Sequence, residues 1–111
     1  MAKVVGIVPV DLKPGITDDQ VQELAADFVR RFKVPGIIHA RLAKADRGER
    51  TGKYVFMWEF ESVEVRDRYF PTPGVASDAW QQNFAGAPAE LVDRFFTLFT
   101  AEFTDYVVLG E

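Results

Sequence analysis

His39 is the only histidine of the 111-residue chain, and imidazole is the side chain whose ordinary pKa best suits proton transfer near neutral pH. Arg41 follows two residues later, and its guanidinium could neutralise a carboxylate or an enolate. In an aromatic cavity, His39 would act as a base that removes an acidic proton from a phenol or an enol-like compound. The structural alternative is a half-buried histidine bonded to a neighbour and an arginine paired with an acid at a rim. No orienting carboxylate is evident from the sequence, which favours this alternative.

A strand-like segment beginning at Lys53 holds the densest aromatic pattern of the chain. Period-two alternation puts its aromatic residues on one face and Val55 and Met57 on the other. The aromatic residues are Tyr54, Phe56, Trp58 and Phe60. They could form a flat slot for an aromatic ligand, with Tyr54 as a hydrogen-bond donor, or they could belong to a core or an interface. Both faces of this strand require cover, so the second face should meet another subunit or enclose a ligand.

The elements that would position these residues begin with a strand at residues 3–12, which are rich in Val and Ile and end before a Pro-Gly turn. Thr17 and Gln20 fit a capping box that starts a helix, and Pro35 followed by glycine stops it. Residues 37–44 predict a second strand. A long polar tip joins this strand to the aromatic strand as a hairpin.

The second half predicts an interrupted helical layer and a final strand. Ser62 is the predicted N-cap of a short helix, and residues 75–84 predict a weaker helical segment after a Pro-Gly break. Residues 88–100 carry an apolar stripe at helical spacing and predict the best amphipathic helix of this half. Residues 103–109 predict the fourth strand.

Three further candidate site residues come from these later elements. Trp80 could belong to a lid over a pocket mouth, although a surface tryptophan packed on a loop explains it equally well. Asp105 and Tyr106 lie on the fourth predicted strand, and the sequence does not settle their side of the sheet.

The order strand, helix, strand, strand, broken helix, strand predicts an α+β fold of the ferredoxin-like, split β-α-β type. Residues 1–111 would form a single domain with a four-stranded antiparallel sheet and helices on one face. The bare face would project on the order of 400 Å², which is at the limit of what soluble monomers tolerate. We therefore expect a homodimer through the sheet face.

Two segments carry a resemblance that covers nearly the whole chain. They are Lys13-Pro14-Gly15-Ile16-Thr17 and the run from Tyr54 to Glu64, where the aromatic strand enters a Ser-x-Glu helix start. With them the chain resembles the dimeric αβ-barrel superfamily, and is similar to antibiotic-biosynthesis-type monooxygenases and stress-responsive barrel proteins. The resemblance implies a pocket lined by the third strand and its neighbours, in families whose activities span cofactor-free oxygenation, isomerisation, cyclisation, haem chemistry and no known reaction.

The resemblance also bears on cofactors and on the facing of the strands. Haem-degrading relatives would place a histidine in the second helix region, where this chain has none, so we expect no haem and no other cofactor. Pairing of Lys44 with Lys53 would put Arg41 opposite Phe56 and His39 opposite Trp58, so that all face the barrel. The helices would then cover Ile38, Ala40, Leu42, Val55 and Met57. Glu59 would point toward the helices in this register, which is costly for an unpaired carboxylate, so either it lies at the sheet edge or the register differs.

Composition narrows the classes of partner. The net charge of −4 and the pI near 5.0 provide no basic field for nucleic acid or anionic membrane surfaces. The sequence shows no signal peptide and no apolar span of membrane length, so we expect a cytoplasmic protein. Without cysteine and with one histidine, no metal site based on thiolates or on two imidazoles is expected.

Two hypotheses of different class remain. One is a cofactor-independent enzyme, of monooxygenase, isomerase or cyclase type, that acts on a small aromatic or polyketide-like compound with His39 as base. The other is a non-catalytic, ligand-binding or stress-associated dimer whose aromatic sheet face is the subunit interface.

Overall fold

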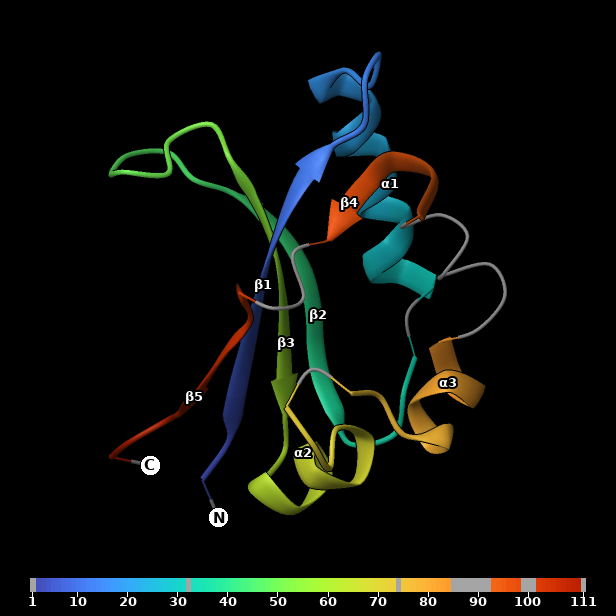
Figure 1. Cartoon of the computed structure of the whole chain (residues 1–111), viewed down its shortest axis with the longest axis vertical. Coiled ribbons are helices and arrows are strands. Elements are labelled where there is room, and N and C mark those ends of the chain that lie inside the picture. Colours follow the sequence, from blue (N-terminus) through green and yellow to red (C-terminus); the bar gives the residue numbers. More distant parts are fainter. Residues whose placement is uncertain (1, 32, 74, 85–92, 99–101, 111) are drawn as a thin grey trace.

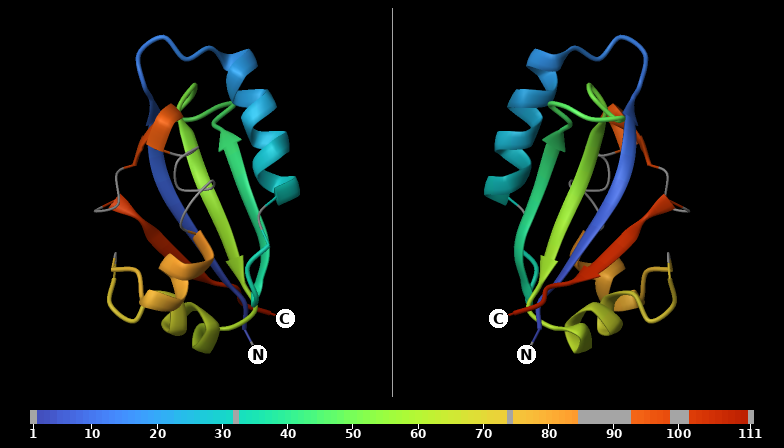
Figure 2. Two further views of the ribbon diagram at one scale, coloured as in Figure 1. Left: turned by 90° about the vertical axis from the view of Figure 1, so that its right-hand side faces the viewer. Right: turned by 90° about the vertical axis from the view of Figure 1, so that its left-hand side faces the viewer.

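The computed structural model of the chain describes residues 2–31, 33–73, 75–84, 93–98 and 102–110. One antiparallel sheet carries the helices on a single side, as Figures 1 and 2 show. The elements are β1 (Val4–Leu12), α1 (Asp18–Arg31), β2 (Ile37–Lys44), β3 (Tyr54–Phe60), α2 (Val63–Tyr69), α3 (Asp78–Phe84), β4 (Phe96–Leu98) and β5 (Thr104–Val107). This is the α+β, ferredoxin-like order that the sequence predicts.

The sheet runs in the order β2-β3-β1, and both β4 and β5 pair with the far side of β1. β5 pairs with Val4 to Ile7 and β4 pairs with Val10 to Leu12. The predicted fourth strand, residues 103–109, is present as β5, whereas β4 is a fifth strand that the sequence did not predict. Pro9 lies beside the gap between the segments of β1 that pair with β5 and with β4. Proline has no backbone N–H to give to a ladder, which suits this position. Both chain ends lie at the same end of the sheet (Figure 1).

Both predicted N-caps are confirmed. At the start of α1, the Thr17 amide donates to Gln20 Oε1 at 2.8 Å, and the Gln20 amide donates back to Thr17 Oγ1 at 3.2 Å. At the start of α2, the Val65 amide donates to Ser62 Oγ at 3.2 Å. These caps fix where the two helices begin over the sheet.

We call the sheet face beneath the helices the inner face. Every second residue of β3 is buried there, and the side chain of Phe56 is 1% exposed. Trp58 meets Trp80 of α3 edge-on with ring centroids 5.3 Å apart, and Phe56 meets Phe96 of β4 in the same way at 5.3 Å. The aromatic set of β3 is therefore the core of a single chain, so the prediction that it forms the subunit interface is wrong.

The predicted hairpin register is also wrong by one residue. Lys44 pairs with Tyr54, not Lys53, and this register continues without interruption to His39, which pairs with Glu59, before a β-bulge near Ile38. Because side chains alternate along a strand, this shift puts His39 on the face opposite the aromatic residues. Arg41, which pairs with Met57, lies there too, whereas Ala40 and Leu42 lie under the helices as predicted. We call this second face, which no described helix covers, the open face.

The predicted helix at residues 88–100 is corrected in part. Residues 93–95 are helical, but Phe96–Leu98 forms β4, while residues 88–92 and 99–100 lie outside the described part of the chain. Pairing with the end of β1 and burial of Phe96, which is 1% exposed, outweigh the local helical pattern. α3 begins at Asp78, three residues after the predicted start.

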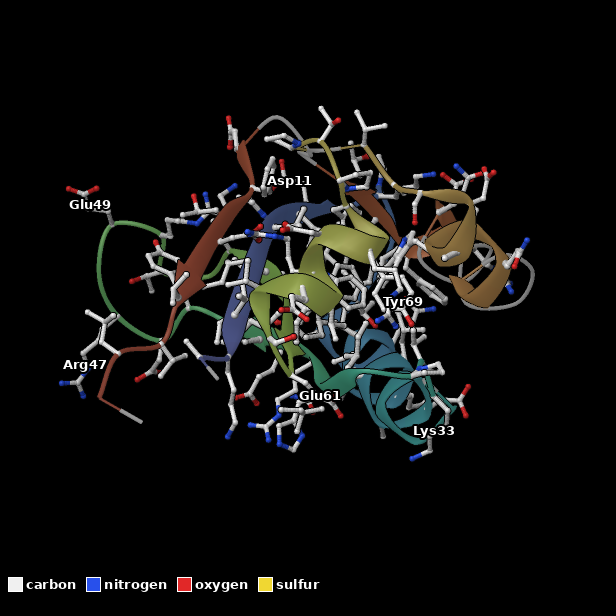
Figure 3. All side chains as sticks on the ribbon, turned by 90° about the horizontal axis from the view of Figure 1, so that it is seen from below. Asp11, Lys33, Arg47, Glu49, Glu61 and Tyr69 are labelled. Carbon is white, nitrogen blue, oxygen red and sulfur yellow. The ribbon has the colours of Figure 1, made fainter. Side chains whose placement is uncertain are left out.

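Charged side chains surround this framework on its outside. In Figure 3, Arg47 and Glu49 project from the hairpin tip and Lys33 and Glu61 point outward, while Tyr69 lies inside the molecule. None of the described helices is both long enough and apolar enough to cross a membrane.

Candidate functional site

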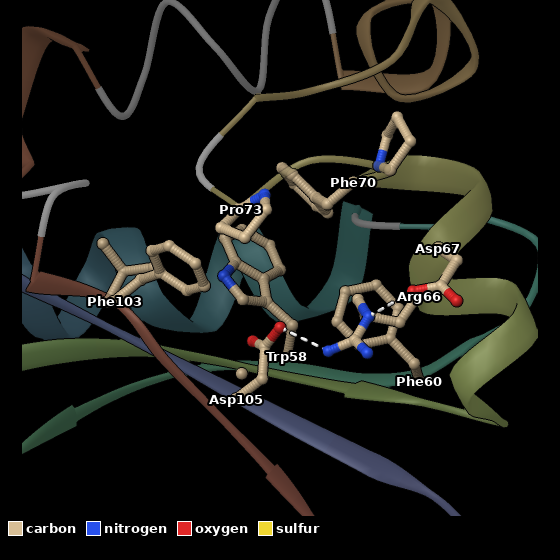
Figure 4. Close-up of a pocket in the computed structure, with 11 residues that line it drawn as sticks. Trp58, Phe60, Arg66, Asp67, Phe70, Pro73, Phe103 and Asp105 are labelled. Carbon is tan, nitrogen blue, oxygen red and sulfur yellow. Dashed lines mark hydrogen bonds and ion pairs between the residues drawn. The ribbon is translucent and has the colours of Figure 1, made fainter.

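A cavity of about 230 Å³ lies between the inner face of the sheet, α2 and β5, and we call it the inner cavity (Figure 4). Its walls are mainly aromatic and proline rings, and one arginine and two aspartates provide its polar groups. The lining residues are Gly6, Val8, Trp58, Phe60, Arg66, Asp67, Phe70, Pro71, Pro73, Phe103 and Asp105. An apolar enclosure with a few convergent polar groups is the usual form of a small-molecule site.

α2 supplies the cation of the inner cavity. Val65 and Tyr69 are the buried residues of this short helix, and Tyr69 OH donates to the carbonyl of Pro35, which ties the helix to the start of β2. Arg66, beside Val65, is thereby held against the sheet with its side chain 22% exposed. Its Nη1 donates to Asp105 Oδ2 at 2.7 Å and its Nε donates to Asp67 Oδ1 at 2.8 Å.

The carboxylate of Asp105 can lie against the sheet and reach Arg66 because the residue beneath it, Gly6, has no side chain. Asp105 of β5 pairs with Gly6 of β1, and Gly6 pairs on its other side with Trp58 of β3. Asp105 Oδ1 lies 2.8 Å from the position that a Cβ on Gly6 would occupy, so any larger residue there would push the carboxylate away. Gly6 is therefore the residue that lets an acidic group lie flat on the inner face beside Trp58.

The ion pairs keep the cation charged under all ordinary conditions. The hydrogen bond to Asp67 is the largest cause that raises the pKa of the Arg66 guanidinium, and the bond to Asp105 adds to it. Figure 4 shows Arg66 and Asp105 pointing toward each other across the edge of the aromatic walls. The inner cavity thus combines an apolar slot with one fixed, charge-assisted hydrogen-bond pair.

The structure brings two of the predicted pocket residues, Trp58 and Phe60, into the wall of the inner cavity. Phe56 packs instead against Phe96. Trp80 is buried against Trp58 and Tyr69, so it belongs to the core and does not lie over a pocket mouth from outside.

Tyr54, the fourth aromatic residue of β3, takes part in a separate polar cluster. Its hydroxyl donates to Asp18 at the start of α1, and Lys44 Nζ lies 3.0 Å from the other oxygen of that carboxylate. The bond from Tyr54 is the largest cause that lowers the pKa of Asp18. Burial, followed by the bond to Asp18, raises the pKa of Tyr54. This cluster fastens the first turn of α1 to the hairpin.

His39 and Arg41 lie on the open face in a hollow of about 240 Å³ that Glu59, Met57 and Val5 also line. His39 Nε2 is 3.8 Å from Glu59 Oε2, and their side chains are 49% and 26% exposed. Glu59 therefore provides the carboxylate partner that the sequence did not reveal, because the hairpin register, in which Lys44 pairs with Tyr54, brings the two residues opposite each other.

Tyr106, the remaining predicted residue, lies opposite Val5 on the open face and is 55% exposed. The predicted site residues therefore divide between two faces of the sheet and do not form one constellation. Within the described ranges, no group of three or more His, Asp or Glu side chains is arranged to hold a metal ion.

Sequence reasoning missed Arg66 as a site residue and left Asp105 without a side. They are separated by 39 positions, so no local spacing joins them. Two signals were available. Gly6 interrupts a strand otherwise rich in branched residues, which indicates a close approach, and Arg66 lies four positions before Phe70 on a short amphipathic helix.

Comparison with known proteins identifies the fold. No protein-family model matches the chain, and no curated protein matches its sequence significantly. Among solved structures, a dimeric protein of unknown function and ferredoxin-like fold from Bacteroides fragilis has a TM-score of 0.55 at 13% identity, with 96% of each chain covered. A dabb family protein of ferredoxin-like fold from Mesorhizobium loti has a TM-score of 0.54 at 14% identity, covering 99% of this chain and 100% of that one.

A third structure of the same fold is an enzyme. SnoaB, a cofactor-independent oxygenase from Streptomyces nogalater, has a TM-score of 0.53 at 13% identity, covering 100% of this chain and 97% of that one. Likeness at this level of identity concerns architecture. The resemblance stated from the sequence is confirmed at that level, and the chain has the ferredoxin-like α+β fold shared by these proteins.

Proposed function

We propose that the chain binds a small, mainly apolar organic molecule in the inner cavity. The observation that carries this proposal is a cavity of about 230 Å³ walled by Trp58, Phe60, Phe70 and Phe103. An apolar cavity of about 150 Å³ already holds benzene, so this volume suits a molecule of one or two rings. Burial of such a molecule against aromatic walls would supply most of the binding free energy.

Native mass spectrometry on protein purified from its own host tests this proposal. We expect an extra organic mass on the folded chain. The substitution Val8→Phe, which fills the cavity from β1, should remove that mass, whereas Gln22→Phe on the exposed side of α1 should retain it. Wild-type protein without any retained mass, and without affinity for small aromatic probes, would overturn the proposal.

The open face is proposed as the surface that meets a second copy of the chain. Val5, Ile7, Val55 and Met57 are only half-buried on this face within one chain, and Tyr106 is exposed there. The Bacteroides fragilis protein of this fold is described as dimeric, which supports the same assembly here. Covering these side chains would remove an apolar patch from water.

Sedimentation velocity checks the dimer. We expect a dimer for the wild type and a monomer for Ile7→Glu, because a carboxylate buried at an interface is costly unless it is paired. Gln22→Glu adds the same charge on α1 and should leave the dimer unchanged. A monomeric wild type at tens of micromolar would contradict the assembly.

An enzymatic role is a second candidate, and the pairing of His39 with Glu59 favours it. A carboxylate beside an imidazole orients the ring and stabilises its protonated form. In this proposal His39 removes a proton from an enol-like substrate and Arg41 stabilises the resulting anion, in a site that the second subunit encloses. SnoaB, which is described as a cofactor-independent oxygenase, is a protein of this fold that works without a cofactor.

Exchange of deuterium into 2-tetralone, an enolisable ketone whose acidic protons are benzylic, tests this role without knowledge of the natural substrate. We expect wild-type protein to accelerate the exchange, and His39→Ala to lower the rate about 10²-fold or more. Asp105→Asn, which alters the inner cavity, is the control for loss of ligand binding elsewhere. Exchange that is no faster than in buffer, or that survives His39→Ala, would overturn His39 as a base.

A further inference from the structure

The polar end of the inner cavity presents one hydrogen-bond acceptor with a vacant position. Asp105 Oδ2 is held by Arg66 Nη1 at 2.7 Å, but Asp105 Oδ1 accepts no hydrogen bond from any residue that the structure describes. Oδ1 lies 2.8 Å from the position that a Cβ on Gly6 would occupy, and Phe60 Cε2 and Trp58 Cδ1 lie 3.6 and 3.7 Å from that same position. An ionised carboxylate offers about four lone-pair positions, so this oxygen remains able to accept from a ligand in the cavity.

The charges around this acceptor disfavour an anionic ligand. Arg66 already has two carboxylates within hydrogen-bond distance, Asp105 at 2.7 Å and Asp67 at 2.8 Å. One positive charge therefore stands against two negative charges, and a ligand carboxylate would meet net repulsion. The guanidinium has five N–H groups, of which these two bonds use two, so it can still donate to a neutral oxygen.

A hydroxyl group is the chemistry that satisfies both partners at once. Its hydrogen can be donated to Asp105 Oδ1, and its lone pair can accept from a remaining N–H of Arg66. A hydrocarbon without polar groups would leave the Asp105 acceptor and the Arg66 donor to water. A carboxylate can accept a hydrogen bond from Arg66 but has no hydrogen to donate to Asp105. The aromatic walls require that this hydroxyl be carried by a flat, apolar body.

We propose that the inner cavity selects neutral hydroxylated aromatic compounds, phenols above all, and that Asp105, aligned by Arg66 and by the space above Gly6, is the residue that determines this specificity. This inference rests on the proposed function, because it specifies the ligand class of the same cavity. In this proposal Asp105 discriminates between ligands, and the aromatic walls supply the affinity for the apolar part of the ligand.

Isothermal titration calorimetry at pH 7 with three probes tests the inference on the wild-type protein. The probes are naphthalene, 2-naphthol and 2-naphthoate, which share one ring system and differ in the polar group. We expect 2-naphthol to bind about tenfold more tightly than naphthalene, since a hydrogen bond to a charged acceptor has about that effect. 2-Naphthoate should bind more weakly than naphthalene.

Asp105→Asn should reverse the order of the two polar probes. Arg66 will hold the amide oxygen of the new residue, which leaves an NH₂ donor where Oδ1 was and removes one negative charge. We expect 2-naphthol to lose its advantage over naphthalene and 2-naphthoate to gain affinity, while naphthalene binding changes less than threefold. Glu23→Gln, the same loss of one negative charge on the exposed side of α1, should leave all three affinities as in the wild type.

The outcomes separate this inference from the proposed function. If no probe binds the wild-type protein, the cavity is not a ligand site and both proposals fail. If naphthalene binds and 2-naphthol binds no more tightly, or if 2-naphthoate binds best, the proposed role of Asp105 in specificity is wrong. The cavity remains a ligand site in either case. The comparison of three probes on wild-type protein gives this answer even where Asp105→Asn does not fold.

Discussion

Each face of the sheet holds an acid–base pair, Arg66 with Asp105 on the inner face and His39 with Glu59 on the open face, yet the two pairs differ in what their charges can do. On the inner face, Arg66 and Asp105 are 2.7 Å apart, and only about a fifth of each side chain is exposed. On the open face, His39 and Glu59 are 3.8 Å apart and are more exposed to water. Charge-assisted hydrogen bonds gain strength as water is excluded, so the inner pair is rigid and directional while the outer pair is adjustable. Depth in the fold, more than residue type, distinguishes the proposed ligand cavity from the proposed docking surface.

The largest expected difference concerns adjacent residues of β3 that face opposite ways. Phe56→Ala should lower the free energy of unfolding by about 3–5 kcal/mol, because it empties a core position against Trp58 and Phe96. Met57→Ala on the open face should cost about 1 kcal/mol. Urea denaturation at matched protein concentration measures both. Equal losses would show that the open face is packed as tightly as the core and would remove the distinction between the faces.

A smaller difference is expected between the two ion pairs. Asp105→Asn should lower the free energy of unfolding by about 1–2 kcal/mol, since it weakens a charge-assisted hydrogen bond that is partly shielded from water. Glu59→Gln should cost less than about 0.5 kcal/mol, as is usual for exposed pairs. The same denaturation assay compares them. A larger loss for Glu59→Gln would mean that the outer pair is buried in the assembled protein.

The smallest effect concerns pH and the Tyr54 hydroxyl. The pKa of Asp18 is lowered in the folded state, so its stabilising contribution is complete above the unfolded value of about 3.9 and is lost as the pH falls through the folded value. Tyr54→Phe removes the largest cause of that shift. We expect the variant to lose less stability than the wild type when the pH is lowered from about 5 to about 2.

Tyr106→Phe provides the matched control for this titration, because Tyr106 lies half-exposed on the open face. Thermal unfolding followed by circular dichroism gives the melting temperature at each pH. The control should follow the wild-type curve. A Tyr54→Phe curve parallel to that of the wild type would show that the hydroxyl does not set the titration of Asp18.

Local patterns predicted most of the fold. The capping residues Thr17 and Ser62, the Pro-Gly stops and the period-two aromatic strand each act within a few residues of the chain, so β1, α1, β2, β3 and α2 lie close to their predicted positions. β4 was missed because Phe96 belongs to an apolar stripe with helical spacing, and the pairing of β4 with β1 joins segments more than eighty positions apart.

The candidate site was predicted less well for a related reason. Trp58 and Phe60 were expected to line a ligand pocket, and the structure places both in the wall of the inner cavity. Their predicted partners His39 and Arg41 lie on the other face, because Lys44 pairs with Tyr54 and not with Lys53, and the long hairpin tip did not indicate this one-residue difference in register. The pair of Arg66 and Asp105 depends on how α2 and β5 meet across the sheet, which no spacing in the sequence expresses. The cytoplasmic location stays a prediction.

The bulge near Ile38 has a further consequence, for aggregation. β2 is an outer strand of the sheet among those described, so the backbone groups on its free side could accept a strand from another molecule. The bulge breaks the regular spacing of those groups, and Arg41 and Lys44 place positive charge along the same strand. An incoming strand would therefore meet an irregular and charged edge. The bulge beside His39 thus discourages growth of the sheet from chain to chain.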